Sequence, residues 1–442
     1  MKNLFLAVFS SILLSAFPLS VPAMSAAPAE YVPTPENVAA REEFRDNKFG
    51  IFLHWGLYSM LASGEWTMNN HNLNYKEYAK LAGGFYPAKF DAAKWVAAIK
   101  ASGARYICFT TRHHDGFSMF GTKLSDFNIV DATPFGRDVL KELADECRKQ
   151  GVKLHLYYSH IDWSREDAPR GATGRGTGRP AQKEAAAAWK SYYAFMNGQL
   201  TELLTNYGEI GAIWFDGFWD QKPNFNWQIA EQYALIHRLQ PACLIANNHH
   251  RAANAGEDIQ VFERDLPGQN RAGYSGQLVS ALPLETCETM NGMWGYKISD
   301  QNYKSAGTLI RYLVSAAGRN ANLLMNIGPQ PDGELPEIAL ERLAEVGEWL
   351  KIYGETIYGT RDGNVPPQTW GVTTRKENRL FVHILDWSGK KLFVPLGDGN
   401  APRQVLDFLS REPLEFRERD GGIELTLKAV PAAPDTVVEL VF

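Results

Sequence analysis

The amino-acid sequence predicts an α/β protein in which a (β/α)8-like TIM barrel is followed by a C-terminal β-sandwich domain. Two patterns support this fold class. Up to about residue 358, apolar runs of strand length alternate with helical stretches, as in repeated βα units. After Gly359, short segments alternate apolar and polar residues and are separated by turns. Because the chain has 442 residues, one large domain and one small domain are expected, at 24–358 and 359–442.

The first 23 residues read as a signal peptide. A lysine at position 2 precedes an apolar stretch that is too short to cross a bilayer, and Val21-Pro22-Ala23 offers small residues for cleavage. An uncleaved anchor is the alternative interpretation. Since no later stretch is long and apolar enough to cross a membrane, we expect no stable membrane insertion and a periplasmic or secreted protein.

Charge and cysteine content exclude several classes of partner. The formal net charge is -5 and the pI is about 6.1, so the basic surface that nucleic acids need is not expected. The four cysteines are far apart and form no C-x-x-C pair, so they indicate neither a zinc site nor a redox pair. The sequence therefore predicts a neutral small-molecule substrate, and a homo-oligomer remains possible.

The barrel elements follow one another in regular order. Apolar runs without alternation are typical of strands that are buried on both faces of a parallel barrel, and glycines such as Gly151 and Gly208 mark the ends of the helices between them. We expect strands at 49–56, 104–111, 152–159, 210–215, 244–247 and 322–328, and helices at 39–48, 91–103, 138–150, 184–207, 229–239, 304–318 and 336–353.

Two stretches fit neither element. Residues 165–180 are rich in Gly, Arg and Thr, which predicts a long mobile loop. Residues 252–299 are too polar and too interrupted for one element, so we expect them to be irregular. In the C-terminal domain, strands are expected at 379–386, 391–396, 422–428 and 436–442, with the domain boundary near 358–371.

Polar residues gather where the predicted barrel strands end. A single Asp-Gly such as Asp216-Gly217 is more often a turn than a catalytic group. The carboxyl ends of barrel strands, however, converge on one mouth, where such enzymes carry their chemistry. The residues at these ends are His54, Trp55, His113, His114, Tyr157, Asp216, Arg251 and Asn326. A role in packing alone does not account for so many polar residues at strand ends, so they indicate a functional site.

No motif indicates a metal or a cofactor. Neighbouring histidines, as in His113-His114 and His249-His250, point in opposite directions on an extended chain and cannot easily share one zinc ion. The phosphate-binding and serine-hydrolase motifs G-x-x-x-x-G-K-[ST], G-x-G-x-x-G and G-x-S-x-G are absent.

Carboxylate chemistry is the remaining interpretation of the strand-end residues. Cleaving a glycosidic bond needs two carboxyl groups; Asp216 is one candidate, and Glu263, Glu285 and Glu288 are candidates for the other.

Five segments together resemble the motifs of glycoside hydrolase family 29, the α-L-fucosidases. The resemblance extends from about His54 to Phe442. The segments are Phe49-Gly-Ile-Phe-Leu-His-Trp-Gly56, Arg112-His-His-Asp-Gly-Phe117, Tyr157-Tyr-Ser-His-Ile-Asp-Trp163, Ile213-Trp-Phe-Asp-Gly217 and Leu323-Leu-Met-Asn-Ile-Gly-Pro-Gln-Pro-Asp-Gly333. The resemblance implies a retaining, exo-acting hydrolase of terminal α-L-fucosyl linkages on oligosaccharides or glycoconjugates, built from a (β/α)8-like barrel and a β-sandwich.

The same resemblance assigns roles to individual residues. Asp216 matches the nucleophile of the family, and Glu263 is the favoured acid/base, with Glu285 or Glu288 as alternatives. The Leu284-Glu-Thr-Cys287 segment resembles one whose glutamate can be a structural partner of the site, so a structural role is favoured for Glu285. The residues expected to bind substrate are His54, Trp55, Trp66, His113, His114, Tyr157, Trp214, Arg251 and Trp294.

Two rival functions remain open. An exo-glycosidase acting on α-L-galactosides would share the hydroxyl arrangement of fucose and differ at C6. A catalytically inactive barrel that only binds sugar would keep the fold without turnover, but the presence of Asp216 and several candidate glutamates argues against it.

Overall fold

The structure is a computed structural model that describes residues 31–397 and 401–442. Residues 32–442 form one compact unit. The predicted signal peptide, residues 1–23, lies outside the described residues.

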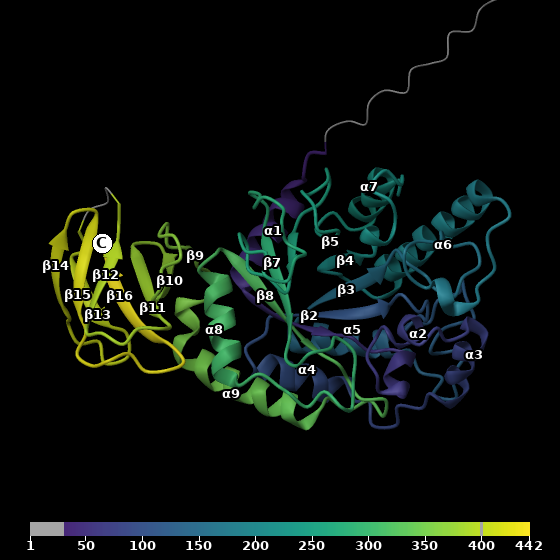
Figure 1. The fold of residues 1–442 in the computed structure, drawn as a ribbon, viewed down its shortest axis with the longest axis horizontal. Coiled ribbons are helices and arrows are strands. Elements are labelled where there is room, and N and C mark those ends of the chain that lie inside the picture. Colours follow the sequence, from purple (N-terminus) through teal and green to yellow (C-terminus); the bar gives the residue numbers. More distant parts are fainter. Residues whose placement is uncertain (1–30, 398–400) are drawn as a thin grey trace, which may run out of the picture. The chain divides into compact units, whose positions relative to one another are not determined.

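A sheet of eight parallel strands forms the centre of the larger domain (Figure 1). Its order is β5-β4-β3-β2-β1-β8-β7-β6, and β1 pairs in parallel with both β2 and β8. A single parallel bridge between Ala246 and Ile259 connects the two edges, so the sheet closes into the predicted barrel. The strands are β1 (Phe49–Leu53), β2 (Tyr106–Arg112), β3 (Lys153–Ser159), β4 (Ala212–Asp216), β5 (Leu244–Asn248), β6 (Gln260–Glu263), β7 (Leu284–Thr289) and β8 (Ala321–Ile327).

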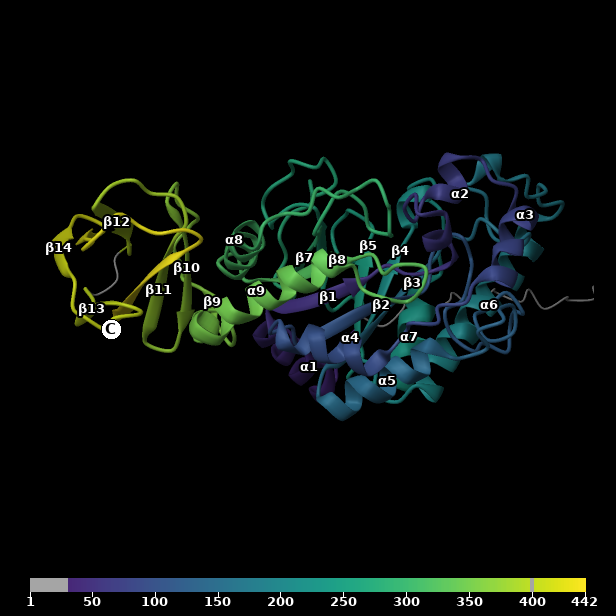
Figure 2. The ribbon, with the colours of Figure 1, turned by 90° about the horizontal axis from the view of Figure 1, so that it is seen from below.

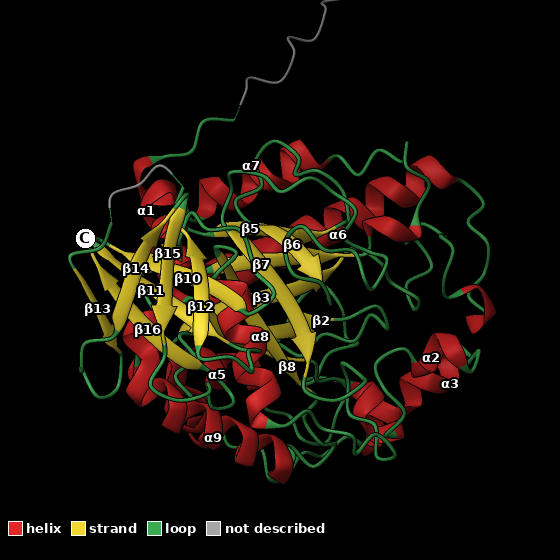
Figure 3. Cartoon of the chain, turned by 60° about the vertical axis from the view of Figure 1, so that its left-hand side comes forward, coloured by secondary structure: helices red, strands yellow, loops and turns green. Residues whose placement is uncertain are grey.

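Helices cover the outside of this barrel. Figure 2 shows α4 and α5 beside each other along the sheet, and in Figure 3 the red helices lie around the yellow barrel strands. The helices are α1 (Pro35–Asn47), α2 (Thr67–Asn70), α3 (Tyr75–Ala79), α4 (Ala92–Ala101), α5 (Val139–Gln150), α6 (Ala185–Asn206), α7 (Ile229–Leu239), α8 (Ala306–Ala317) and α9 (Glu337–Tyr353), with short 3-10 helices η1 (Leu57–Leu61), η2 (Lys80–Gly84), η3 (Arg175–Thr177), η4 (Phe218–Asp220) and η5 (Gly354–Thr356).

The caps of these helices follow from local sequence. The Asp91 and Asp138 side chains accept hydrogen bonds from backbone N–H groups in the first turns of α4 and α5. Gly151 ends α5 with a φ of 71°, a conformation that glycine adopts without the strain a side chain would add. These caps are why the predicted helix boundaries lie close to the observed ones.

The expectation of an irregular region at 252–299 is wrong in part. This stretch contributes β6 and β7, and both belong to the barrel sheet. The two strands are short, and their inward side chains include the polar Glu285, so they lack the apolar run that marks the other strands. In the described chain, no helix lies between β5 and β6 or between β6 and β7, so the barrel departs from strict βα alternation.

Alternation along β1 separates two packed layers. Phe52 packs inside the barrel with Tyr106, Tyr157 and Trp214, whereas its neighbours Ile51 and Leu53 belong to the larger core between the barrel and its helices. Successive side chains of a strand point to opposite faces. His54 therefore continues the inner face, and Trp55 continues the outer one.

The C-terminal domain consists of antiparallel sheets of five and three strands, ordered β13-β16-β11-β10-β9 and β12-β15-β14. An apolar cluster that includes Leu380, Val394 and Leu425 fills its interior, which confirms the β-sandwich. The boundary between 358 and 359 stays a prediction, and the first strand begins at Arg361. The strands are β9 (Arg361–Asp362), β10 (Gly371–Lys376), β11 (Arg379–Ile384), β12 (Lys391–Pro395), β13 (Gln404–Asp407), β14 (Glu415–Arg419), β15 (Gly422–Thr426) and β16 (Thr436–Val441).

All four cysteines lie in the barrel domain. Cys108, Cys147, Cys243 and Cys287 are buried free thiols. They pack as small apolar side chains, and Cys108 lies inside the barrel as its place in a strand predicted. No helix in residues 31–397 or 401–442 combines the length and the apolar character that crossing a membrane requires.

Candidate active site

A cavity of about 320 Å³ opens at the carboxyl ends of the barrel strands. Most of its lining comes from the strand ends and the segments that follow them, where a barrel brings distant parts of the chain together. We call it the strand-end cavity. It is lined by Phe52, His54, Glu65, Trp66, His113, His114, Tyr157, Trp214, Asp216, Trp219, Asn248, His250, Glu263, Tyr274, Cys287 and Trp294.

Asp216 ends β4 inside this cavity, with only 8% of its surface exposed. Its Oδ2 accepts a hydrogen bond of 3.0 Å from the hydroxyl of Tyr157. Its Oδ1 accepts 2.8 Å hydrogen bonds from Nε1 of Trp219 and from the backbone N–H of Gly217. Gly217 turns the chain at a φ of 106°, which brings its own N–H and the indole of Trp219 back onto the carboxylate. The carboxylate is therefore held in one orientation.

Glu263 ends β6 and lies across from Asp216. Its Oε2 accepts a 2.8 Å hydrogen bond from Nδ2 of Asn248 and lies 3.1 Å from Nε2 of His250. The same Asn248 nitrogen is 3.5 Å from Oδ1 of Asp216. These two oxygens cannot lie farther apart than the sum of both distances, which is below the roughly 6.5–9.5 Å of inverting glycosidases and leaves room for the roughly 5–5.5 Å of retaining ones.

The two carboxyl groups differ in how they hold a proton. Burial, and then the neighbouring Glu263 carboxylate, raise the pKa of Asp216 to about 6, although the Trp219 and Tyr157 hydrogen bonds oppose this. Burial also acts to raise the pKa of Glu263, but hydrogen bonds from His250 and Asn248 outweigh it and leave that pKa below its ordinary value. Of the two carboxyl groups, Asp216 therefore keeps a proton to the higher pH.

Histidines form the floor of the cavity. Burial lowers the pKa of His54 and of His114 to about 3 and also lowers that of His113, so all three rings are neutral near pH 7. Nδ1 of His54 lies 2.7 Å from Oδ1 of Asn326. A neutral imidazole has one donor and one acceptor nitrogen, which suits sugar hydroxyl groups.

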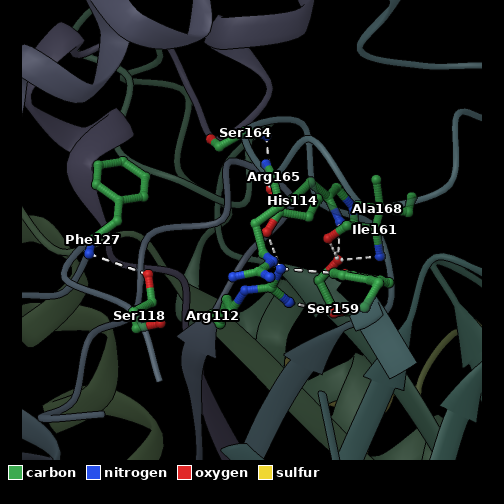
Figure 4. Close-up of polar contacts among 12 residues, drawn as sticks. Arg112, His114, Ser118, Phe127, Ser159, Ile161, Ser164, Arg165 and Ala168 are labelled. Atoms are coloured by element: carbon green, nitrogen blue, oxygen red, sulfur yellow. Dashed lines mark hydrogen bonds and ion pairs between the residues drawn. The ribbon is translucent and has the colours of Figure 1, made fainter. Parts of the chain in front are cut away.

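A network behind the floor fixes His114. Figure 4 shows Ser159 between Arg112, His114 and Ile161. Oγ of Ser159 lies 2.7 Å from Nδ1 of His114 and accepts a 2.9 Å hydrogen bond from the backbone N–H of Ile161. Nη1 of Arg112 donates a 3.0 Å hydrogen bond to the Ser159 carbonyl. Because Nδ1 is engaged, Nε2 of His114 faces the cavity, 3.5 Å from Oδ2 of Asp216.

Aromatic side chains make the walls. Trp66 and Trp219 stack with ring centroids 5.5 Å apart and planes 19° apart. Trp294 lies on another side, with its centroid 5.3 Å from that of His54. Trp214 stacks on Tyr157 at 5.6 Å. Trp66, Trp214 and Trp294 thus all reach the cavity, where the aromatic wall was expected.

Two residues expected at the site do not line it. Trp55 is fully buried outside the barrel, where it packs against Phe90 and Trp95, because strand alternation directs it away from His54. Arg251 is exposed, and the cavity takes up its neighbour His250 instead. His250 has a φ of 60°, and this turn sends its ring inward and Arg251 outward.

Of the three glutamates considered as the second carboxyl group, Glu263 alone lines the cavity. Glu285 is fully buried inside the barrel, where it accepts hydrogen bonds from Tyr106 and Trp214, and burial raises its pKa to about 7. Glu288 points to the other face of β7 and lies 3.5 Å from Nζ of Lys304. Neither glutamate is placed to reach a sugar bound in the cavity.

The structure also brings in residues that the sequence analysis did not select, namely Phe52, Glu65, Trp219, Asn248, His250, Tyr274 and Cys287. Three of these residues lie close in the sequence to positions already considered. Trp219 and Asn248 lie within a few residues of the strand ends, and Glu65 precedes Trp66. Tyr274 comes from the long loop after β6, and no sequence signal marked it. Among the described residues, no cluster of three or more His, Cys, Asp or Glu side chains is arranged to hold a metal ion.

Several known proteins that this chain resembles in sequence and structure are α-L-fucosidases. A family model described as Alpha-L-fucosidase matches residues 19–355. Human plasma alpha-L-fucosidase is 30% identical over 406 residues, which cover 83% of this chain and 80% of the relative. Alpha-L-fucosidase isoenzyme 1 from Paenibacillus thiaminolyticus is 32% identical with a TM-score of 0.80, covering 92% of this chain and 99% of the other. A trapped covalent intermediate of an alpha-L-fucosidase GH29 from Bacteroides thetaiotaomicron is 26% identical with a TM-score of 0.81, covering 94% and 98%.

Proposed function

The chain belongs to the α-L-fucosidase family, and from this premise we propose that Asp216 and Glu263 divide the two roles of its reaction. The protein is a glycoside hydrolase, an exo-acting α-L-fucosidase that acts on fucosylated glycans with retention of configuration. Asp216 is the nucleophile and Glu263 is the acid/base. The observation that carries this assignment is the single Asn248 amide that contacts both carboxylates.

In the first step, Asp216 attacks the anomeric carbon of fucose. The new carboxyl-to-carbon bond forms as the glycosidic carbon-oxygen bond breaks, and the proton of Glu263 goes to the departing oxygen. In the second step, Glu263 takes a proton from water, and the resulting hydroxide displaces Asp216 from the anomeric carbon. Two displacements restore the α configuration. A covalent intermediate of this kind was trapped in the relative from Bacteroides thetaiotaomicron.

The substrate must reverse the order in which the two carboxyl groups hold a proton. Asp216 has the higher pKa of the two, while the reaction needs Asp216 ionised and the proton on Glu263. The Glu263 side chain is still 18% exposed. A glycan that covers it removes the remaining water, which disfavours the charged carboxylate and moves the proton toward Glu263.

The size and lining of the cavity support exo action on one sugar ring. Its volume of about 320 Å³ is at the small end of the roughly 300–1,000 Å³ usual for ligand pockets. The neutral His54, His113 and His114 offer donors and acceptors to the ring hydroxyls, and Trp66 and Trp294 offer apolar surface to the C–H faces and the C5 methyl group.

The assignment is tested with alanine variants and azide. Asp216→Ala and Glu263→Ala should both lose at least about 100-fold in turnover of an aryl α-L-fucoside. With azide, Asp216→Ala should yield β-fucosyl azide, because azide takes the place of the nucleophile. Glu263→Ala should yield α-fucosyl azide, because azide attacks the covalent intermediate. The same configuration from both variants would refute the division of roles.

Substrate choice is tested on the wild-type protein by comparing aryl α-L-fucoside with aryl α-L-galactoside. The apolar wall predicts a preference for fucoside of about 10–200-fold, the range that one small group gives in an apolar pocket. Equal turnover would favour the broader α-L-galactosidase activity. Binding of fucose without turnover of either compound would identify a sugar-binding barrel.

We also propose that the protein is exported, with residues 1–23 removed as a signal peptide. The basic start, the short apolar stretch and the small residues before position 24 support this. Intact-mass analysis after expression with the native N-terminus should find a mature chain that starts at Met24. A full-length chain retained in the membrane fraction would indicate an anchor instead.

A further inference from the structure

Tyr274 is the most exposed residue of the strand-end cavity. Asp216, His54, His113 and His114 are buried, whereas Tyr274 is 47% exposed. The Tyr274 ring stacks on that of His250, with centroids 5.3 Å apart and planes 24° apart. His250 in turn contacts Glu263. A continuous row of contacts therefore leads from the exposed Tyr274 through His250 to Glu263 inside the cavity.

The loop that carries Tyr274 is held in place by its own hydrogen bonds. Asp265 accepts hydrogen bonds from the backbone N–H groups of Arg271 and Ala272. The Asn270 side chain accepts another, of 3.0 Å, from the backbone N–H of Ser275. Beyond Tyr274, Gln277 donates a 3.0 Å hydrogen bond to the carbonyl of Val261 in β6. Tyr274 thus lies in a loop that is held by its own hydrogen bonds and is also hydrogen-bonded to β6, the strand that ends in Glu263.

The reaction requires the leaving group to lie beside the acid that protonates it. With fucose at Asp216, the glycosidic oxygen points toward Glu263, and whatever is attached to that oxygen passes the groups on the solvent side of Glu263. Those groups are His250 and Tyr274. An exposed aromatic ring can cover the apolar C–H face of a sugar, and such rings contribute large contact areas.

We propose that Tyr274, stacked on His250, is the leaving-group subsite, which binds the sugar ring to which fucose is attached through the C–H face of that ring. This inference rests on the proposed function, because it takes Glu263 as the acid. It assigns the loop after β6 a role in choosing the glycan, apart from the fucose-binding part of the cavity. The ring of Tyr274 supplies the contact, and its hydroxyl is dispensable.

Two substrates distinguish a contact with the leaving group from a general effect on catalysis. The first is α-L-fucosyl fluoride, which has a single atom as its leaving group and cannot occupy the subsite. The second is the fucosyl disaccharide that the wild-type protein cleaves best among the α1,2-, α1,3-, α1,4- and α1,6-linked compounds. Tyr274→Ala should lower kcat/KM for the disaccharide by about tenfold, mainly through KM, because the lost contact is made by the bound ring. The loss of kcat/KM on the fluoride should be much smaller than the loss on the disaccharide, because the fluorine atom makes no contact with the ring.

Matched variants complete the test. Tyr274→Phe keeps the ring and should restore most of the kcat/KM that Tyr274→Ala loses on the disaccharide. Tyr86→Ala removes another exposed tyrosine, one that does not line the cavity, and should change neither substrate. Thermal unfolding of each variant establishes that the proteins tested are folded.

Two results would overturn the subsite. An equal loss on disaccharide and fluoride would show that Tyr274 shapes the catalytic groups themselves. No loss on either would show that the ring does not touch the leaving group. Failure of the wild-type protein to hydrolyse fucosyl fluoride is a different result, because it would refute the proposed function without any Tyr274 variant.

Discussion

The groups around Asp216 set the lowest pH at which this nucleophile is ionised. The hydrogen bonds from Trp219, Tyr157 and Gly217 favour the carboxylate, while burial and Glu263 disfavour it. The second group of effects is the stronger, so the pKa lies above the ordinary value, at about 6. A nucleophile must be ionised to attack. We therefore expect kcat/KM for α-L-fucosyl fluoride, whose leaving group needs no proton from Glu263, to fall as the pH drops through about 6.

Trp219→Phe tests this account of the acidic limb. The substitution removes the 2.8 Å hydrogen bond to Oδ1, which favours the charged form, so the pKa of Asp216 should rise. One such bond corresponds to roughly one pH unit. The acidic limb of the kcat/KM profile should move to higher pH by about that amount. Trp387→Phe, which removes an indole in the C-terminal domain, should leave the limb in place. An unshifted limb in Trp219→Phe would mean that another contact sets the pKa.

Lys48, which lies between α1 and β1, is a buried amine with no hydrogen-bond partner for Nζ among the described residues. Burial, followed by the positive charge of Arg361, lowers its pKa to about 7. The unfolded chain holds that proton up to about pH 10.5. Between these values the unfolded state binds more protons, so the stability of the folded protein rises with pH on account of Lys48.

Lys48→Met should therefore raise the free energy of unfolding at pH 7 by a few kcal/mol. The advantage over wild type should be about 3 kcal/mol smaller at pH 9.5, where the wild-type amine is already neutral in the folded state. Denaturant unfolding at both pH values measures it. Lys153→Met serves as the control. Lys153 forms surface ion pairs with Glu43 and Glu209, so its loss should cost no more than about 1 kcal/mol at either pH.

The candidate site was predictable where a residue ends a strand with a strong apolar run. Asp216 ends β4 and His54 directly follows β1, and alternation also explains why Trp55, one position farther, points away from the cavity. Tyr274 could not be found, because its position depends on the Asp265 and Asn270 hydrogen bonds of a loop, and these have no sequence period. Arg251 lies outside the cavity for a related reason, since a single positive φ at His250 decides which side chain enters it.

At the scale of elements, the same reasoning separates the predicted strands from the missed ones. β1 and β4 are nearly continuous apolar runs, and β2 and β8 contain the apolar runs Tyr-Ile-Cys-Phe and Leu-Leu-Met, because helices cover their outer faces and other side chains fill the barrel. β7 has the sequence Leu-Glu-Thr-Cys-Glu-Thr and is nevertheless fully buried. Its inward Glu285 is satisfied by Tyr106 and Trp214, partners that lie far away in the sequence. Only the assembled barrel makes this strand stable.

The segment after β3 is anchored to the barrel by one buried ion pair. Arg112 and Asp162 contact each other with both side chains fully buried, and Asp162 also accepts hydrogen bonds from the N–H groups of Ser164 and Arg165. This segment begins the stretch that was predicted to be a long loop. The pair fixes its entry beside His114.

Asp162→Asn should lower the free energy of unfolding by about 3–5 kcal/mol, because it leaves the Arg112 charge buried without its counterion. Asp167→Asn is the matched control. It removes a partner of Arg165 in the same segment, but that pair is partly exposed, so a loss of about 1 kcal/mol or less is expected. Urea unfolding compares the two variants. Similar losses would mean that the buried pair contributes no more than the partly exposed one.

At the scale of the whole molecule, the barrel and the β-sandwich share packed surface. Val372 of β10 belongs to the hydrophobic core that also contains the barrel helices, and it lies against Gly318 at the end of α8. Oγ1 of Thr374 donates a 2.6 Å hydrogen bond to the carbonyl of Thr356. Tyr353, the last residue of α9, stacks on Phe408 of the sandwich with centroids 5.6 Å apart. We therefore expect both domains to unfold in one cooperative transition.

Tyr353→Ala tests whether this shared surface couples the domains. The variant loses the stacks on Phe408 and Trp349, which should weaken the contact by about 3 kcal/mol. Calorimetry should then show the sandwich melting before the barrel, in a separate transition. Below that transition, kcat/KM for fucosyl fluoride should match wild type, because every residue that lines the strand-end cavity comes from the barrel domain. Phe393→Ala, at a side chain 43% exposed on β12, should keep the single transition. If Tyr353→Ala melts in one step and loses activity in parallel, the sandwich supports the site directly instead of only stabilising the barrel.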